Sequence, residues 1–343
     1  MIIPYRTRRF FKGLATFLLA LILLFILVWG VWILWLDRFV VYSRDGAKLD
    51  FTLQEPQSGQ LAVPPAAEDP ITIYYNEGEN ALNTSTELTQ LSGYYITTTM
   101  LMENPTQVLD LVRKLPDQAP VLIEMKDIVG RCYYQSEVAP VKEDVDMDTI
   151  SKIVEHLTRS NLYAIARIPA FRDYTFGLNN VPFGLPHKSG RGLWMDEARC
   201  YWLNPGSDGA LNYLVSLVEE LKAMGFNEVL LGDFRFPATD QIKFSGSKSE
   251  TLISAAQRLT TACATNQFCL SFLIDDTAFT LPEGRTRVYL ENRTAADVKT
   301  LAEELMLEDP TVKMAFITDL KDTRFDAYGV LRPITSVDPE ELS

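Results

Sequence analysis

Charged side chains follow several short apolar runs of this chain, at the points where buried strands would end. The clearest case is the run Val229-Leu230-Leu231, which is followed by Asp233 and Arg235. A buried strand needs neither a carboxylate nor a guanidinium, and α/β proteins keep their chemistry just beyond the carboxyl ends of strands. Other apolar runs are followed in the same way by Glu124, Lys126 and Asp127, by Arg167, by Asp275 and Asp276, by Glu291, and by Asp319.

Several carboxylates at one rim favour glycoside hydrolysis, which needs two carboxyl groups, one as acid and one as nucleophile or base. We predict that Asp233 is one catalytic carboxylate and that Glu291 or Asp275 is the acid. The side chains predicted to bind and orient the substrate are Glu124, Lys126, Asp127, Arg167, Asp173 and Arg235. Each of these has a structural alternative, in which it pairs with a neighbouring charge or begins a loop. Only their accumulation at one face favours a site.

The connection between residues 169 and 204 is the longest in the domain and is rich in aromatic side chains. Connections of this length in compact domains are usually functional, and flat aromatic rings suit the faces of sugar rings. We therefore predict that Trp194 and Trp202 stack on the substrate. The alternative is that both rings fix the connection onto the domain.

From residue 92 onward, short apolar runs alternate with amphipathic segments. The predicted strands are Tyr94–Thr98, Pro120–Met125, Leu162–Ile168, Glu228–Leu231, Phe268–Ile274, Arg287–Leu290, Val312–Ile317 and a short eighth, Tyr328–Leu331. The predicted helices are Pro105–Leu115, Met147–Ser160, Asp208–Met224, Lys248–Ala264 and Thr294–Leu307, with Thr294 as the N-cap of the last.

This alternation indicates a parallel sheet with right-handed crossovers. Seven or eight such units in about 250 residues predict a (β/α)8 TIM-type barrel in which the eighth unit could be incomplete. A doubly wound open sheet is the alternative. It is disfavoured because no predicted strand is followed by the glycine-rich phosphate turn of nucleotide-binding sheets.

Residues 14–36 form an uncharged and almost wholly apolar stretch. A bilayer core needs about 20 such residues, whereas the apolar region of a signal peptide has about 7 to 15. The stretch is therefore predicted to be an uncleaved transmembrane helix. The basic residues Arg6, Arg8, Arg9 and Lys12 precede it, which predicts a cytoplasmic amino terminus and an extracytoplasmic C-terminal domain.

The predicted organisation has four parts: a basic cytoplasmic tail at 1–13, the transmembrane helix at 14–36, a linker and N-terminal extension at 37–91, and the barrel domain at 92–343. The net charge of the chain is −13, and because residues 1–38 carry a local +4, the remainder carries −17. A domain this acidic excludes nucleic acid as a partner.

Four cysteines lie beyond the predicted membrane helix, where disulfides are permitted. Cys263 and Cys269 are close enough in sequence to pair, and free buried thiols are the alternative. The cysteine spacing matches no zinc pattern and the chain has only two histidines, so neither a metal nor a cofactor is expected.

Several phrases of the chain match, in order, those of a known family. They are Ile123–Asp127 with Gly130, Tyr134 and Ser136, then Ala166–Asp173, Tyr201–Pro205, Gly225–Val229 and Asp233–Pro237. On these phrases the chain resembles the "putative glycoside hydrolase domain" family, a bacterial (β/α)8-barrel group whose members are often membrane-anchored or secreted. The resemblance covers residues 93–237 well, and it implies a TIM-type barrel that hydrolyses carbohydrate.

Two departures from the family bear on the site. The family usually places an aspartate one residue earlier in the fourth-strand phrase, where this chain has Gly232, so that the carboxylate stands at Asp233. Side chains alternate along a strand, so this shift can turn the carboxylate away from the pocket, although Gly232 could permit a bulge that re-aims it. On the second strand, Glu124 replaces the usual aspartate.

The predicted function is a membrane-anchored, extracytoplasmic glycoside hydrolase acting on a polysaccharide or cell-envelope glycan, with carbohydrate and the membrane as its partners. The alternative is a catalytically degenerate barrel that serves as a glycan-binding or scaffold module.

Overall fold

The computed structural model describes residue 29 and residues 40–43, 46–49 and 87–336 of the chain. Contacts divide the chain into two compact units, residues 1–78 and 79–343. In the first unit, β1 (Val40–Ser43) and β2 (Gly46–Leu49) form an antiparallel hairpin, within the region where the sequence predicts a linker and extension.

The predicted basic tail lies outside the described residues, as does the predicted transmembrane helix apart from Trp29. Among the residues that the structure describes, no helix has the length and apolar character needed to cross a membrane.

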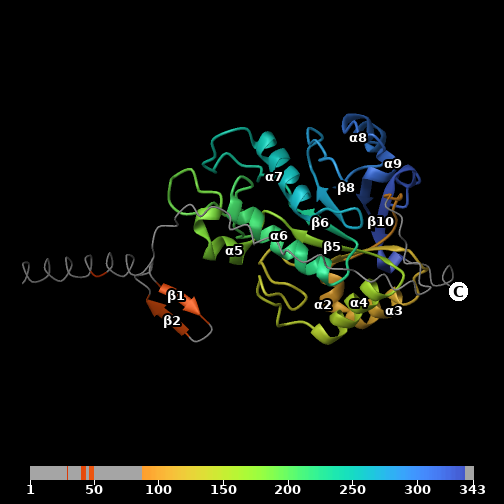
Figure 1. The fold of residues 1–343 in the computed structure, drawn as a ribbon, viewed down its shortest axis with the longest axis horizontal. Helices are drawn as coiled ribbons and strands as arrows, with labels where there is room; N and C mark the ends of the chain where they lie inside the picture. The colour runs from red at the N-terminus through yellow and green to blue at the C-terminus, as the bar shows by residue number, and fades with distance from the viewer. Residues whose placement is uncertain (1–28, 30–39, 44–45, 50–86, 337–343) are drawn as a thin grey trace, which may run out of the picture. The chain divides into compact units, whose positions relative to one another are not determined.

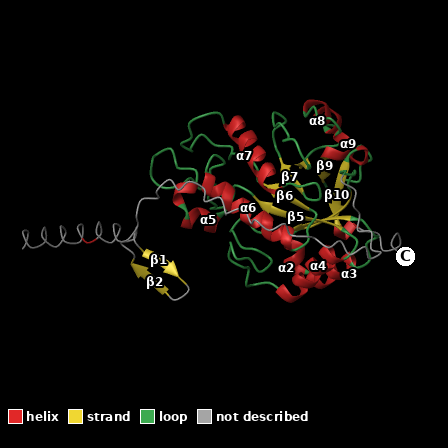
Figure 2. Ribbon diagram, viewed as in Figure 1, coloured by secondary structure: helices red, strands yellow, loops and turns green. Residues whose placement is uncertain are grey.

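The second unit is a closed barrel of eight parallel strands (Figures 1 and 2), which confirms the predicted fold class and excludes the open sheet. The strands are β3 (Ser92–Ile96), β4 (Pro120–Glu124), β5 (Tyr163–Pro169), β6 (Glu228–Gly232), β7 (Cys269–Leu273), β8 (Thr286–Glu291), β9 (Met314–Ile317) and β10 (Gly329–Pro333). They follow one another around the barrel in chain order, and β10 closes it by pairing with both β9 and β3. The short eighth strand is therefore present, one to two residues later than predicted.

Helices surround the strands (Figure 1). They are α2 (Thr98–Glu103), α3 (Pro105–Val112), α4 (Met147–Arg159), α5 (Tyr174–Asn179), α6 (Asp208–Ala223), α7 (Lys248–Cys263), α8 (Val298–Glu304) and α9 (Pro310–Lys313), with 3-10 turns at Val181–Phe183, Phe325–Ala327 and Ile334–Ser336. The last predicted helix is shorter than expected. Its N-cap is Asp297 rather than Thr294, because the Thr294 hydroxyl donates to the Asp297 carboxylate at 2.7 Å and residues 294–297 form a turn.

Side chains alternate between the inside of the barrel and the helices, as the two-residue period of a strand requires. Leu122 and Leu230 belong to a core cluster with buried residues from seven strands and with Tyr95 of β3 packed against it. Val121, Val229 and Leu231 pack in the larger cluster with the helices. Positions two residues beyond Leu122 and Leu230 therefore also face the interior, near the carboxyl ends of the strands. These positions are Glu124 and Gly232.

The amino-terminal layer of the interior contains a buried ion pair between Glu228 and Arg287. Glu228 also accepts hydrogen bonds from the hydroxyls of Tyr163, Ser271 and Tyr289, at 2.6–2.8 Å. Arg287 donates to the backbone carbonyls of Thr89 and Val312. Buried charges are tolerated in a core when they are paired and fully hydrogen-bonded, as these are. This layer fills the interior of the barrel at the amino ends of the strands.

Of the two alternatives for the cysteines, the structure has the second: Cys132, Cys200, Cys263 and Cys269 are all free and buried. Burial raises the pKa of the Cys263 thiol to about 12, so this group behaves as a small apolar side chain.

Candidate active site

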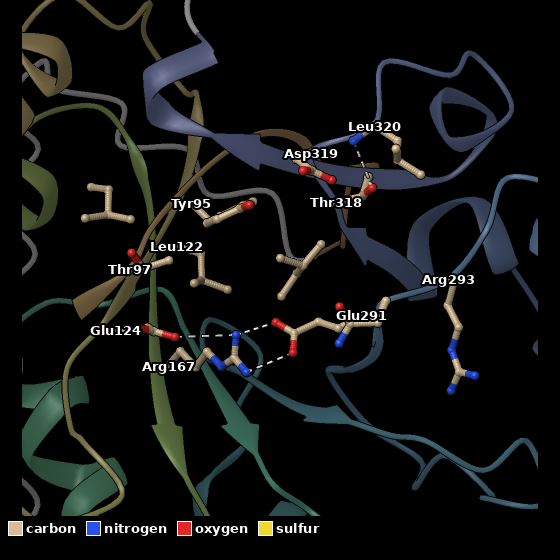
Figure 3. A pocket seen from close by; sticks show the side chains of 13 residues that line it. Tyr95, Thr97, Leu122, Glu124, Arg167, Glu291, Arg293, Thr318, Asp319 and Leu320 are labelled. Atoms are coloured by element: carbon tan, nitrogen blue, oxygen red, sulfur yellow. Dashed lines mark hydrogen bonds and ion pairs between the residues drawn. The ribbon is translucent and has the colours of Figure 1, made fainter. Parts of the chain in front are cut away.

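A cavity of about 510 Å³ opens at the carboxyl ends of the strands, where TIM-type barrels place their active sites. Five of its polar lining residues come from different strand ends: Tyr95, Glu124, Arg167, Glu291 and Asp319. Figure 3 shows Glu124 and Glu291 on either side of the Arg167 guanidinium. Three of the site residues that were predicted from their positions at strand ends therefore line one cavity: Glu124, Arg167 and Glu291.

Arg167 organises this cavity. Its two terminal nitrogens each bond one oxygen of Glu291, with Nη2 to Oε2 at 3.0 Å, and Nη1 lies 3.6 Å from Oε1 of Glu124. Burial by itself would lower the pKa of Arg167, but the carboxylates of Glu291 and Glu124 outweigh that effect and raise it. A forked guanidinium holds two carboxylates in one fixed geometry, which a lysine cannot do.

Glu124 is fixed by a second contact. Its Oε2 accepts a hydrogen bond from the backbone nitrogen of Thr98, at the start of α2, at 2.7 Å. Tyr95 lies in the same cavity, and burial followed by the charges of Asp319, Glu291 and Glu124 raises its pKa. Its phenol therefore keeps its proton and can donate a hydrogen bond into the cavity.

Gly232, rather than Asp233, occupies the interior position at the end of β6. A Cβ built on Gly232 would lie 3.2 Å from Nε of Arg167, so that position points at the guanidinium. Asp233 follows with a φ of +47°, in the left-handed region that aspartate and asparagine tolerate best among residues with a Cβ. The strand ends at Gly232 and the chain turns at Asp233, which is not among the residues that line the cavity.

The Asp233 carboxyl is mostly enclosed, with 23% of its side chain exposed, and its Oδ1 lies 3.8 Å from Nη2 of Arg235. Burial raises the pKa of Asp233, more than the guanidinium groups of Arg172, Arg235 and Arg167 lower it. A carboxyl that holds its proton to higher pH suits the acid of a glycosidase.

Arg235 lies between Asp233 and the aromatic segment at residues 169–204. Its Nε pairs with Oδ2 of Asp275 at 2.9 Å, and its guanidinium lies over the Trp202 ring, 5.1 Å from the centroid. Trp202 is only 2% exposed and donates its indole N–H to Asp196 at 3.0 Å, while Trp194 packs against it, half-buried. Trp202 therefore packs against Arg235 and fixes the connection 169–204 onto the barrel, which is the structural alternative to stacking on a substrate. The buried ring leaves no open face on which a sugar could stack.

Three of the predicted substrate contacts are placed in supporting positions. The fully buried side chains of Lys126 and Asp173 form an ion pair at 2.6 Å. Asp173 also accepts from the Phe176 backbone nitrogen, as N-cap of α5, and from the Tyr213 hydroxyl. Asp127 binds Arg131 four residues later and closes a turn. The side chains of Lys126 and Asp173 have no exposed atoms with which to contact a substrate.

Tyr95 and Asp319 were assigned no role from the sequence. Asp319 does follow an apolar run and could have been included on the same grounds as Glu291. Tyr95 carries no such signal, because a tyrosine inside a strand is an ordinary core residue until the neighbouring carboxylates are known.

Comparison with solved structures relates the barrel to glycosidases at low identity. A Thermus thermophilus α-galactosidase in complex with stachyose is 13% identical, with a TM-score of 0.51 over 74% of this chain and 64% of that one. A GH36 α-galactosidase from Geobacillus stearothermophilus is 8% identical, with a TM-score of 0.49 over 74% of this chain and 41% of that one. The match thus covers less than two thirds of either enzyme, and the first likeness shows the barrel fold alone.

A hypothetical protein from Ruminiclostridium thermocellum is 21% identical, with a TM-score of 0.46 over 55% of this chain and 100% of that one. Among curated proteins, none matches the chain. A family model described as "Putative glycosyl hydrolase domain" matches residues 93–269, more than half of the chain. This match runs from β3 to the start of β7 and includes Glu124, Arg167 and Asp233, so the chain belongs to the putative glycosyl hydrolase domain family.

Proposed function

We propose that the protein is a glycoside hydrolase whose reaction takes place at the barrel mouth, between Asp233 and Glu291. The observation that carries the proposal is the contrast between two carboxyl groups whose charges both act on Arg167. Burial raises the pKa of Asp233, whereas Glu291 is held by both nitrogens of the Arg167 fork. Two carboxyl groups in opposite environments are what acid–base hydrolysis of a glycoside requires.

In this proposal Asp233 is the acid and Glu291 the nucleophile or base. Asp233 gives its proton to the glycosidic oxygen as the bond from that oxygen to the anomeric carbon breaks. Glu291 attacks the anomeric carbon or takes a proton from an attacking water. The sequence favoured Glu291 or Asp275 as the acid, but Asp275 is 62% exposed and paired with Arg235, which makes it a poor proton store. Arg167 and Glu124 position Glu291, and Tyr95 binds the sugar.

The test is hydrolysis of 4-nitrophenyl α- and β-glycosides and of bacterial envelope polysaccharides by the full chain. On an unactivated polysaccharide, Asp233→Asn is expected to lower kcat/KM by about 10² to 10⁴-fold, the usual contribution of a general acid. Asp240→Asn, a change to an exposed acid in the following loop, is the matched control and should have no effect. Wild-type rates for Asp233→Asn would remove the acid assignment.

A second candidate function is glycan binding without turnover, and Gly232 is the observation that favours it. The interior position that carries an aspartate in the family is Gly232 here and has no side chain. Both glutamates in the cavity, Glu124 and Glu291, already form ion pairs with Arg167. A glycan array separates the two candidates. Retention of an oligosaccharide without release of reducing ends would favour the binding module, and cleavage of any glycan would exclude it.

The proposed location is the outer face of a membrane, with residues 14–36 as a single-pass anchor. The support is the length and apolar character of that stretch and the basic residues before it. Resistance to carbonate extraction, together with digestion of the barrel by protease added to spheroplasts, is the expected result. A barrel protected from protease in intact spheroplasts would place it on the cytoplasmic side.

A further inference from the structure

Two loop segments of the barrel domain carry positive charge only. Residues 184–193 and 241–249 contain four basic residues and no aspartate or glutamate; the four are Lys188, Arg191, Lys243 and Lys248. The domain around them is strongly acidic, because the net charge of −13 includes a local +4 in residues 1–38 and leaves −17 for the remainder. Positive charge is thus concentrated in these two segments, against the sign of the domain.

Backbone hydrogen bonds hold the two segments side by side. His187 and Ile242 form an antiparallel bridge, and the backbone nitrogens of Lys188 and Lys243 donate across it at 2.6 and 2.8 Å. Ile242 packs in the core, so the residues on either side of the bridge project from the opposite face, as the two-residue period of extended backbone requires. Lys188 and Lys243 are both exposed on that face.

Arg191 lies at the tip of this structure, which we call the basic ribbon (residues 186–193 and 241–243). The chain turns after His187, whose carbonyl accepts from the Gly190 nitrogen at 2.9 Å and whose ring accepts from the Ser189 nitrogen at 3.1 Å. A Cβ built on Gly190 or Gly192 would meet no other part of the protein within 4 Å. The tip therefore projects into solvent and carries the exposed Arg191 with it.

The cations of the basic ribbon are available to an external anion. In the part of the chain that the structure describes, no carboxylate forms an ion pair with Lys188, Arg191 or Lys243. The acid that adjoins the ribbon in sequence, Asp240, accepts a hydrogen bond from the Gln241 side chain at 2.8 Å instead. Three exposed positive charges are thus held together on one hydrogen-bonded support.

The basic ribbon lies at the end of the barrel where the mouth cavity opens. Its two segments belong to the connections that follow β5 and β6, and connections of this kind lie at the carboxyl ends of the strands. The mouth cavity is lined by residues from the same ends. A polymer that enters the mouth has the ribbon at its rim.

We infer that the basic ribbon binds an anionic polysaccharide, with carboxylate or phosphate groups repeated along its chain, and holds it at the mouth of the barrel. This inference rests on the proposed function, since it takes the bound polymer to be the substrate. Arginine and lysine both form charge-assisted hydrogen bonds with carboxylate and phosphate groups.

Two other polyanionic surfaces fit less well. Nucleic acid carries one charge per about 1.7 Å of duplex, and the acidic domain around the ribbon repels so dense a charge. A glycan with one charge per sugar can contact the ribbon alone. A bilayer pressed against the ribbon would cover the mouth of the barrel and exclude a polymeric substrate from it.

A binding experiment tests the ribbon without any hydrolysis. The full chain is held in phosphatidylcholine nanodiscs and titrated with fluorescent polygalacturonate, poly(glycerol phosphate) or neutral dextran of similar length. We expect at least one of the two anionic polymers to bind about ten-fold or more tightly than dextran, with an affinity that falls as salt is added. The two anionic probes distinguish carboxylate from phosphate.

The ribbon variant replaces its three exposed cations: Lys188→Gln, Arg191→Gln and Lys243→Gln. The control variant removes the same charge from three exposed positions at the end of α3 and on α4: Arg113→Gln, Lys114→Gln and Lys152→Gln. The ribbon variant should bind the anionic polymer about ten-fold more weakly and with a smaller salt dependence, whereas the control should stay within about two-fold of the wild type. Exchanging lysine for arginine and arginine for lysine at the three ribbon positions keeps the charge, and it should keep the binding even where the glutamine variant folds poorly.

Three results would overturn the inference. They are equal binding by the ribbon variant and the wild type, an equal loss in the ribbon and control variants, and a wild type that binds neither anionic polymer. Recruitment to phosphatidylglycerol vesicles without binding to either polymer would identify a membrane surface as the partner and would overturn it as well.

Hydrolysis separates this inference from the proposed function. On an anionic polymer that the wild type cleaves, the ribbon variant should lower kcat/KM by about ten-fold relative to kcat/KM for a short 4-nitrophenyl glycoside. An unchanged ratio would show that the ribbon does not hold the substrate. Absence of all hydrolysis by the wild type counts against the proposed function, while the binding titration still decides the ribbon.

Discussion

Gly232 of β6 lies beside Arg167 of the neighbouring strand β5, and a Cβ on Gly232 would lie 3.2 Å from Nε of that arginine. The position belongs to the same interior layer as Glu124, two residues beyond a leucine that packs inside the barrel. The carboxylate expected there stands one residue later, at Asp233, where a φ of +47° turns the chain. The carboxylates that pair with Arg167 are therefore those of Glu291 and Glu124.

Gly232→Asp places a second carboxylate within reach of Arg167 and beside Asp233. A like charge nearby raises the pKa of an acid further. Because Asp233 acts in its protonated form, the alkaline limb of the kcat/KM profile should move to higher pH. Gly232→Ala adds the Cβ without the charge and is the control. If both variants shift the limb equally, the effect is steric and the electrostatic coupling is absent.

Asp233→Asn should stabilise the folded protein at neutral pH. The pKa of Asp233 is raised in the folded state, so the folded form binds more protons than the unfolded form and loses stability as pH rises above the unfolded pKa of about 3.9. Asparagine carries no charge and tolerates the same left-handed backbone. Melting temperatures should converge near pH 3 and separate toward pH 7, with the variant higher. A variant that melts lower at pH 7 would contradict this.

Arg167→Lys should lower kcat/KM by about 10²-fold, because an ammonium cannot hold Glu291 and Glu124 in the forked geometry and a displacement of about 1 Å costs that much. Arg131→Lys changes a comparable forked contact, that with Asp127, which lies outside the mouth cavity. Equal kinetics in the two variants would show that Arg167 does not position the site.

Glu228→Gln should destabilise the barrel by about 3 to 5 kcal/mol, since it leaves Arg287 buried without a carboxylate. Burial alone would raise the pKa of Glu228, but Arg287 and the hydroxyls of Ser271, Tyr289 and Tyr163 lower it. Its stabilising contribution is therefore present above the unfolded pKa of about 4.3 and is lost as pH falls through the folded value. Urea titrations at pH 7 and pH 3 measure this difference. Glu155→Gln, in a surface pair with Arg159, should change stability by less than about 0.5 kcal/mol.

Lys126→Met should lower stability by about 3 kcal/mol and leave KM unchanged, because Lys126 neutralises the buried Asp173 and does not reach the cavity. The measurement pairs urea unfolding with KM for the best substrate found. A rise in KM at unchanged stability would return Lys126 to the substrate-binding role that the sequence suggested.

The strand ends could be found from the sequence because two-residue periodicity and charged termini are local signals. Glu124, Arg167 and Glu291 each follow or end an apolar run, and parallel strands bring such ends to one rim. The same signal cannot tell Glu124 from Lys126, which is two residues away but beyond the end of the strand. What separates them is the contact of Lys126 with Asp173 and Tyr213, residues brought close by the loop and by α6.

The partner of Arg167 could not be predicted for a similar reason. Glu291 lies 124 residues further along the chain, and only the closed barrel makes the two side chains meet. The backbone at Asp233 was beyond prediction as well, because either a continued strand or a turn fits the letters Gly232-Asp233-Phe234.

The seam of the barrel also sets the order of events during synthesis. Leu331 of β10 pairs with Gly93 of β3, so the first strand of the barrel waits for the last one to leave the ribosome. At about 5 to 20 residues per second, that wait lasts roughly 10 to 50 seconds. Throughout it, the free edge of β3 is a template for another nascent chain. Slower translation of the C-terminal third should therefore increase aggregation more than slower translation before β3.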